Sequence, residues 1–213
     1  MQRDREIMPP PPAERLADGM VQSVNVMLAV AGCTALGMLI FADADPLRRA
    51  ALTVYGVGLL AMVGCSALYA YGRGSRLRRL YRHLDHAAIF VMIAGTYTPF
   101  TVISIDTGHG LRLLVLVWSI ALLGVLLKLM APRRFEALSV PLYLVMGWAV
   151  VSDPALVLNL PVPVAILLVA GGLFYSVGVV FHLARIRFQE AIWHGFVLLG
   201  AMCHYAAIVR TLP

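Results

Sequence analysis

Charged residues are scarce in this sequence, and their scarcity is its most informative feature. Only 13% of the 213 residues are Asp, Glu, Lys or Arg, whereas 61% are hydrophobic. A soluble domain usually carries about 25% charged residues, and one as apolar as this chain would expose large hydrophobic patches that promote aggregation. We therefore expect a protein whose solvent is a lipid bilayer rather than water.

The sequence also lacks the patterns of several common kinds of site. Its three cysteines, Cys33, Cys65 and Cys203, have neither metal-knuckle nor redox-motif spacing. The segment GCSAL at residues 64–68 lacks the second glycine of a nucleophile elbow, and no phosphate-binding loop is present. The net charge of +6 comes from basic residues in short segments between apolar runs, which indicates membrane orientation. We expect membrane lipids, and not nucleic acid, as partners.

Long apolar runs fill most of the chain. About 20 helical residues cross a hydrocarbon core of ~30 Å. Seven apolar segments of roughly this length occur, at residues 20–41, 50–71, 86–105, 112–131, 136–152, 163–184 and 190–210. Because the polar joints between them are short, the segments should pack as one bundle. The sequence thus predicts an all-α integral membrane protein, a bundle of seven transmembrane helices.

The first 19 residues differ from the rest of the chain. They are polar and contain four consecutive prolines at positions 9–12, which cannot continue a helix. We therefore divide the chain into a polar, proline-rich N-terminal tail, residues 1–19, and a single seven-helix membrane domain, residues 20–213.

The distribution of Lys and Arg predicts the orientation of the bundle. Most of the 17 basic residues lie in the tail and in the joints on the same side as the tail. The other side carries only Arg48, Arg49, Arg112 and Arg210. Cytoplasmic loops of membrane proteins are enriched in Lys and Arg, so we expect the N-terminus to lie in the cytoplasm.

Ionisable side chains gather where the apolar segments meet the basic side. The second predicted helix ends there with Ser66, and the third begins there with Asp85. The seventh begins there with Glu190 and His194, which are four residues apart and so share one helix face. Ionisable groups in a membrane usually face the bundle interior, where a carboxylate and an imidazole can hold a metal or transfer protons. The simpler interpretation is that the carboxylates only interact with the dipoles of their helices.

His204 lies ten residues beyond His194, about 15 Å further along the same helix. The two histidines therefore cannot bind one metal ion. We predict that His204 is a core histidine, hydrogen-bonded across the bundle.

Several longer motifs follow one another in a specific order. They are RHLDH at 82–86, AGTYTPF at 94–100, LYLVMGW at 142–148, GGLFYSVG at 171–178, AIWH at 191–194, and Cys203-His204. Their order and spacing resemble those of the hemolysin III family, which belongs with the progestin and adipoQ receptors. The resemblance covers residues 14–210 and implies a seven-helix, multi-pass protein of the bacterial inner membrane with a cytoplasmic N-terminus.

The resemblance also implies a zinc site near the cytoplasmic side, built from three histidines with a serine and an aspartate close by. The serine corresponds to Ser66, the aspartate to Asp85 and one histidine to His194, while the other two histidine positions hold Ala70 and Glu190. A methyl group cannot bind metal, so the implied zinc site is altered. Its metal ligands here would be His194, Glu190 and Asp85, with Ser66 and Asp85 as catalytic residues; alternatively, the site is free of metal.

The start of the first helix also departs from the family pattern. Where the family has a polar Asn and His, this chain has Asp18 and Gln22.

Three functions are compatible with these features. The first is a metal-dependent hydrolase of lipid amide or ester bonds with an altered active site, acting on a lipid-like substrate. The second is a haemolysin or channel-like membrane protein, although few polar residues occur at mid-helix to line a pore. The third is a lipid-sensing, receptor-like protein without catalysis, whose arginines between residues 73 and 82 bind anionic headgroups.

Overall fold

The described part of the chain is helical. The computed structural model describes residues 11–103, 108–152, 158, 160–184 and 186–212, and within these ranges there is no strand. The α-helices are α1 (Pro12–Ala42), α2 (Pro46–Tyr71), α3 (Arg78–Ile103), α4 (Gly108–Met130), α5 (Pro132–Gly147), α7 (Val162–Leu183) and α8 (Gln189–Val209), and two short 3₁₀ helices are η1 (Gly72–Gly74) and η2 (Ala149–Ser152). The predicted all-α fold is confirmed.

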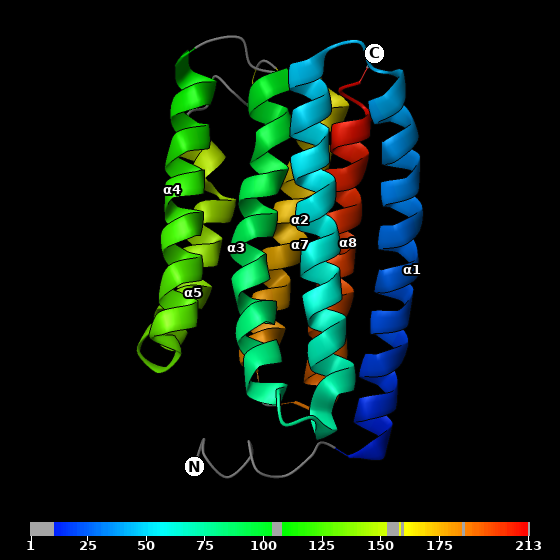
Figure 1. Cartoon of the computed structure of the whole chain (residues 1–213), viewed down its shortest axis with the longest axis vertical. Coiled ribbons are helices and arrows are strands. Elements are labelled where there is room, and N and C mark those ends of the chain that lie inside the picture. The colour runs from blue at the N-terminus through cyan, green and yellow to red at the C-terminus, as the bar shows by residue number, and fades with distance from the viewer. Residues whose placement is uncertain (1–10, 104–107, 153–157, 159, 185, 213) are drawn as a thin grey trace.

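The helices form an elongated bundle (Figure 1). The neighbours along the chain, α2 and α3, α3 and α4, and α7 and α8, lie side by side, and α1 packs against α2 and α8. The start of α1, the α2–α3 connection and the α7–α8 connection meet at one end, opposite the C-terminus. We call it the basic end, since five arginines lie there: Arg76, Arg78, Arg79, Arg82 and Arg187.

Prolines set where several helices begin. α1, α2, α5 and α7 each have a proline in the first turn, where its fixed φ fits and no hydrogen bond is lost. α1 therefore starts at Pro12, the last of the four prolines, and not near residue 20 as the apolar pattern predicted. Residues 12–19, predicted as part of the tail, are the first turns of α1.

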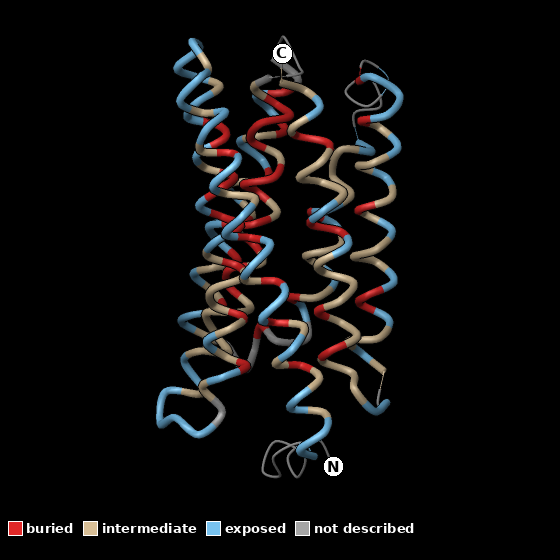
Figure 2. Tube along the Cα trace, turned by 90° about the vertical axis from the view of Figure 1, so that its right-hand side faces the viewer, coloured by how far each residue is buried: buried red, intermediate tan, exposed pale blue. Residues whose placement is uncertain are grey.

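Five of the described helices are long and apolar enough to cross a membrane: α1, α2, α4 from Gly110 onward, α7 and α8. Large apolar side chains are exposed on the outside of the bundle, such as Phe41 (86%) and Met130 (82%), and exposed residues recur along the helices in Figure 2. In a bilayer these side chains contact lipid. The third and fifth predicted spans correspond to α3, which begins with charged residues, and α5, which has only 16 residues.

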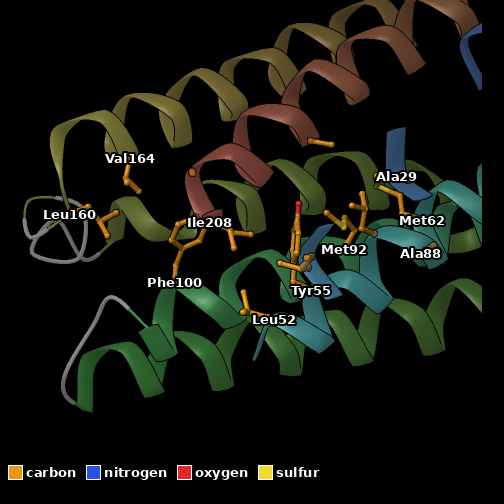
Figure 3. Packing of buried hydrophobic residues seen from close by; sticks show 14 residues of the cluster. Ala29, Leu52, Tyr55, Met62, Ala88, Met92, Phe100, Leu160, Val164 and Ile208 are labelled. Carbon is orange, nitrogen blue, oxygen red and sulfur yellow. The ribbon is translucent and has the colours of Figure 1, made fainter. Parts of the chain in front are cut away.

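Two apolar clusters hold the bundle together, and α3 contributes to both. The larger lies between α1, α2, α3, α7 and α8 and includes Leu52, Tyr55 and Ile208, which Figure 3 shows. The smaller lies between α3, α4 and α5, where the rings of Phe90 and Tyr143 have centroids 4.5 Å apart. These contacts place α3 at the centre of the bundle, between its two halves.

The backbones of α2 and α3 lie close together at Gly95. A Cβ atom at this position would lie 3.5 Å from the carbonyl oxygen of Val54 and 3.7 Å from the Cα atom of Tyr55, which are ordinary van der Waals distances. The two helices that carry Ser66 and Asp85 are therefore in direct backbone contact here.

Candidate functional site

Asp18, Gln22 and Asn25 form a buried polar stripe on α1. Their spacing of four and three residues places them on one face of the helix. Only 2%, 0% and 6% of their respective surfaces are exposed, whereas Met20 and Met27 on the outer side are more than 60% exposed. Buried polar groups are costly unless they are hydrogen-bonded, so the stripe requires polar partners on other helices.

These partners are Ser66 of α2 and His194 of α8, both buried. The hydroxyl oxygen of Ser66 lies 3.2 Å from Nε2 of His194, and Nδ1 of His194 lies 2.7 Å from Oδ1 of Asp18. An ionised Asp18 can only accept, so Nδ1 carries the proton, and Nε2 of a neutral His194 is left to accept the proton of Ser66. The three residues meet because each lies five or six residues from the basic end of its helix.

The series of hydrogen bonds continues along α1. Nε2 of Gln22 donates to the hydroxyl oxygen of Ser66 at 2.8 Å, and Nδ2 of Asn25 donates to Oε1 of Gln22 at 3.4 Å. With this assignment, the carbonyl oxygen of the Asn25 side chain is buried without a hydrogen-bond partner among the described residues. An orphaned buried acceptor is costly, so a ligand with a donor group would stabilise this position.

Asp85 of α3 and Glu190 of α8 add negative charge to the same region. Asp85 is half-buried, hydrogen-bonds with the hydroxyl of Ser66, and interacts electrostatically with His194, Glu190 and Asp18. Glu190 is also half-buried, and its charge acts on Asp85 and on Tyr69. Since Ser66 has one proton, His194 and an ionised Asp85 compete to accept it.

These side chains line a cavity of about 2110 Å³ at the basic end. Its polar wall includes Gln22, Ser66, Asp85 and His194, and its apolar wall includes Met62, Val63, Ile89, Val179 and Val197. The five arginines that define the basic end line it as well. Sites for drug-sized ligands usually occupy about 300–1,000 Å³. A larger cavity with polar and apolar walls suits an amphiphilic ligand.

The start of α8 is held in place by its connection to α7. Phe188 precedes the helix with φ 58°, in the left-handed region that non-glycine residues seldom adopt. The side-chain amide of Gln189 then donates to the backbone carbonyl of His182 at the end of α7. This sharp turn brings α8 back alongside α7 and sets the depth of His194.

The side chains present do not fit the implied zinc ion in this arrangement. Both ring nitrogens of His194 are engaged, one with Ser66 and the other with Asp18. Among the residues that the structure describes, no three His, Cys, Asp or Glu side chains are grouped so that they could hold a metal ion. Ala70 offers only a methyl group. Zinc held by His194, Glu190 and Asp85 therefore stays a prediction.

His204 has a different environment from His194. Its Nε2 lies 3.3 Å from the backbone carbonyl oxygen of Leu168 on α7, and its ring centroid is 5.5 Å from that of Tyr175. The prediction of a core histidine that is hydrogen-bonded across the bundle is confirmed.

Asp18, Gln22 and Asn25 were not among the predicted site residues. The sequence carried a signal for them, because the intervals of four and three residues between positions 18, 22 and 25 place three polar side chains on one helix face. The resemblance placed Asp18 and Gln22 near the start of the first helix but implied no role for them in the site, and the division of the chain after residue 19 left Asp18 in the tail.

Comparison with known proteins covers nearly the whole chain. A family profile described as "Haemolysin-III related" matches residues 21–205. The chain is 34% identical over 203 residues to "Hemolysin-3" of Bacillus cereus, covering 94% of this chain and 93% of that protein. It is 33% identical over 198 residues to the "Hemolysin-3 homolog" of Bacillus subtilis (strain 168), covering 92% and 93%.

A more distant relative is the human "Monocyte to macrophage differentiation factor". It is 27% identical over 208 residues, covering 93% of this chain and 84% of that protein. The resemblance that the ordered motifs indicated is therefore confirmed over the helices that carry the site.

Proposed function

This chain belongs to the haemolysin-III related family of integral membrane proteins, and from that premise we propose that it hydrolyses an amide or ester bond of a lipid-like substrate. The cavity at the basic end is the proposed active site. By the positive-inside rule this end faces the cytoplasm, so substrate enters from the inner leaflet.

The observation that carries the proposal is the hydrogen bond between Ser66 and His194 in the wall of a large amphiphilic cavity. A hydroxyl and an imidazole in contact are the minimum needed to move a proton at a carbonyl centre. Both side chains are buried. A hydrogen-bonded polar pair beside the apolar wall of a cavity contributes nothing to apolar packing. A substrate carbonyl beside Ser66 would place its acyl chain along the apolar wall.

The polar groups around this pair indicate the chemistry of the substrate. The side-chain oxygen of Asn25 can accept a hydrogen bond but has no donor among the described residues. It therefore suits the N–H of an amide, or a hydroxyl, next to the scissile bond. The arginines of the basic end favour an anionic headgroup or an anionic membrane surface. An acylated lipid with an N–H or O–H group near its carbonyl satisfies both features.

His194 is the group that holds and moves the proton. Asp18 keeps Nδ1 protonated and fixes the plane of the ring, while Nε2 faces Ser66 and the cavity. A histidine positioned in this way contributes about 10²–10⁴-fold as a general acid and base.

The channel-like alternative has less support. A conducting path needs polar groups that face a continuous wet lining. The hydroxyls of Thr96, Thr98 and Ser176 instead donate to backbone carbonyls four residues earlier in their own helices. Thr98 and Ser176 also accept hydrogen bonds from Trp118 and Trp148, so these hydroxyls are engaged within the packed bundle. The polar side chains that line the cavity lie at the basic end, where they form a site rather than a path.

Reconstituted protein tests the proposal. Proteoliposomes containing N-acyl or O-acyl lipids, with and without an anionic headgroup, would be analysed for released fatty acid by mass spectrometry. We expect release by the wild type, a rate about 10³-fold lower for His194→Gln, and nearly normal release by His204→Gln, the same substitution on the same helix.

Two results would contradict the proposal. One is the absence of fatty-acid release from every lipid in the panel, and the other is an equal rate for wild type and His194→Gln. Tight lipid binding without release would favour the receptor-like alternative.

A further inference from the structure

A carboxylate, an imidazole and a hydroxyl from three helices stand in series, and the imidazole and the hydroxyl line the cavity. Asp18 of α1 contacts Nδ1 of His194 at 2.7 Å, and Nε2 of the same ring contacts the hydroxyl oxygen of Ser66 at 3.2 Å. The carboxylate fixes the tautomer, so the lone pair of Nε2 points at the serine. This arrangement converts a weakly nucleophilic hydroxyl into an effective nucleophile in unrelated folds.

The contact between Ser66 and Nε2 of His194 is unfavourable for a metal-activated water, whereas a carboxylate on the other ring nitrogen also occurs in metal-bound histidines. Zinc ligation takes the lone pair of an imidazole nitrogen. In His194, Nδ1 is the donor to Asp18 and Nε2 is the acceptor from Ser66, so neither nitrogen has a lone pair to spare. Where the resemblance implies a second histidine, Ala70 is apolar and buried.

We propose that Ser66 is the nucleophile, that its oxygen becomes covalently acylated, and that the reaction needs no metal ion. This inference rests on the hydrolase function proposed above and names the atom that attacks. His194 is the base that contacts the reacting oxygen, and Asp18 is a positioning residue that acts through His194.

The steps balance without a further reactant besides water. The oxygen of Ser66 forms a bond to the substrate carbonyl carbon, its proton passes to Nε2 of His194, and the carbonyl oxygen becomes negatively charged. The C–N or C–O bond to the leaving group then breaks, and His194 gives its proton to the departing amine or alcohol. Water, deprotonated by His194, next attacks the acyl carbon, and Ser66 recovers its proton as the fatty acid leaves.

Gln22 supplies a donor for the charge that develops on the carbonyl oxygen. Its Nε2 lies 2.8 Å from the oxygen of Ser66 and is therefore next to any carbonyl that this oxygen attacks. Asn25 holds the other end of the Gln22 amide, so the donor is oriented before the substrate binds. Donors that are pre-oriented in this way stabilise a developing oxyanion.

Asp85 distinguishes this mechanism from direct attack by water. It hydrogen-bonds with Ser66 and interacts electrostatically with His194, whereas the base nitrogen of His194 contacts the oxygen of Ser66 directly. If water attacked, Asp85 would be an alternative base. If Ser66 attacks, acylation depends on His194 and Asp18 and depends little on Asp85.

Covalent labelling tests the inference directly. Purified protein in lipid nanodiscs would be incubated with an alkyl fluorophosphonate in the presence of EDTA, and the adduct would be located by peptide mass spectrometry. We expect one adduct, on Ser66. The labelling rate should fall at least ~100-fold in His194→Gln and Asp18→Asn and stay within about 10-fold in Asp85→Asn.

Ser23→Ala is the matched control. Ser23 lies on α1 near the same end, but its hydroxyl contacts the carbonyl oxygen of Gly19 and the hydroxyl of Tyr71, so labelling should be unchanged. Thermal unfolding of each variant in nanodiscs identifies any that fails to fold, and slow labelling counts only for variants with a melting profile like that of the wild type.

The outcomes separate this inference from the proposed function. Lipid hydrolysis that continues in EDTA without a Ser66 adduct overturns the nucleophile and keeps the hydrolase. Hydrolysis that EDTA abolishes and zinc restores overturns the metal-free mechanism. A Ser66 adduct that depends on His194, in protein that hydrolyses no lipid of the panel, keeps the nucleophile and overturns the proposed substrate class.

Discussion

The two histidines of α8 have the same side chain on the same helix and very different partners. His194 contacts a carboxylate and a hydroxyl from two other helices and lines a cavity. Among the described residues, His204 hydrogen-bonds with a backbone carbonyl and packs against Tyr175. An imidazole can take part in a reaction only where its second ring nitrogen contacts a group that can react. Burial alone therefore does not identify a functional histidine.

The surroundings of the two histidines differ in the same way. Around His194, α1 supplies polar side chains and the helices leave space for a ligand. Around His204, α7 supplies Gly171, where an added Cβ would overlap the imidazole ring and lie 3.1 Å from the carbonyl oxygen of Gly200. One end of α8 is organised around a cavity, and the other around close helix packing. Predictions that separate activity from stability test this comparison.

Asp18→Asn should have the largest effect, and it should fall on activity. The amide cannot hold His194 in the required tautomer, so we expect kcat to fall about 10²-fold with KM nearly unchanged, a smaller loss than in His194→Gln because Asp18 acts only through His194. Steady-state hydrolysis in proteoliposomes measures this. Glu14→Gln, one turn earlier on α1, is the control and should retain activity; equal losses in the two variants would mean that charge at this end, and not the hydrogen bond to His194, matters.

Gly171→Ala should affect stability instead. The added methyl group meets the ring of His204 and the backbone of α8, and overpacking of this kind costs about 1–3 kcal/mol. A lower melting temperature in nanodiscs, with normal turnover per folded molecule, is expected. Gly64→Ala is the matched control, since nothing lies within 4 Å of its Cβ position; a similar loss there would show that helix packing at Gly171 is not special.

Asn25→Ala tests whether Asn25 takes part in substrate recognition. It removes the orphaned acceptor and the support for Gln22, and an unmade hydrogen bond costs about 1–3 kcal/mol. We expect kcat/KM for an N-acyl lipid to fall at least ~10-fold and that for the matching O-acyl ester to fall less. Measurement of both substrates in one preparation gives the ratio, and equal losses would remove Asn25 from substrate recognition.

His204→Gln should have the smallest effect. It replaces one hydrogen bond to a carbonyl, a change of about 0.5–1.5 kcal/mol, and leaves the cavity untouched. A small decrease in melting temperature without a change in lipid hydrolysis is expected. Loss of hydrolysis at constant stability would show that the two ends of α8 are coupled and would break the comparison.

Part of the site could be anticipated from topology. Ser66, Asp85 and His194 lie near the ends of apolar segments on the basic side, so the sequence predicted that they share a depth, and the structure places them together. Helix length and alternation of direction are enough for such a prediction, because depth in a bundle depends on position along the chain. The rotation of each helix about its own axis does not follow from helix length. The sequence therefore did not predict which side chains face one another.

The contact between Asp18 and His194 lay beyond such reasoning. The two residues are 176 positions apart, and the four prolines before Asp18 suggested a tail rather than the first turns of a helix. Pro12 in fact starts α1, because a proline that cannot continue a helix is well suited to begin one. The absence of a nucleophile elbow was similarly uninformative, since Ser66 lies within a regular helix and its hydroxyl is hydrogen-bonded by side chains of two other helices, α1 and α8.

The sequence by itself determined that this protein is a helical integral membrane protein of a particular family, because apolar run length and the order of motifs are local properties of the chain. Tertiary structure alone decided that His194 is engaged by Asp18 and Ser66, because this depends on how α1, α2 and α8 are rotated against one another. That rotation follows from close packing summed over the whole bundle, and no single segment encodes it.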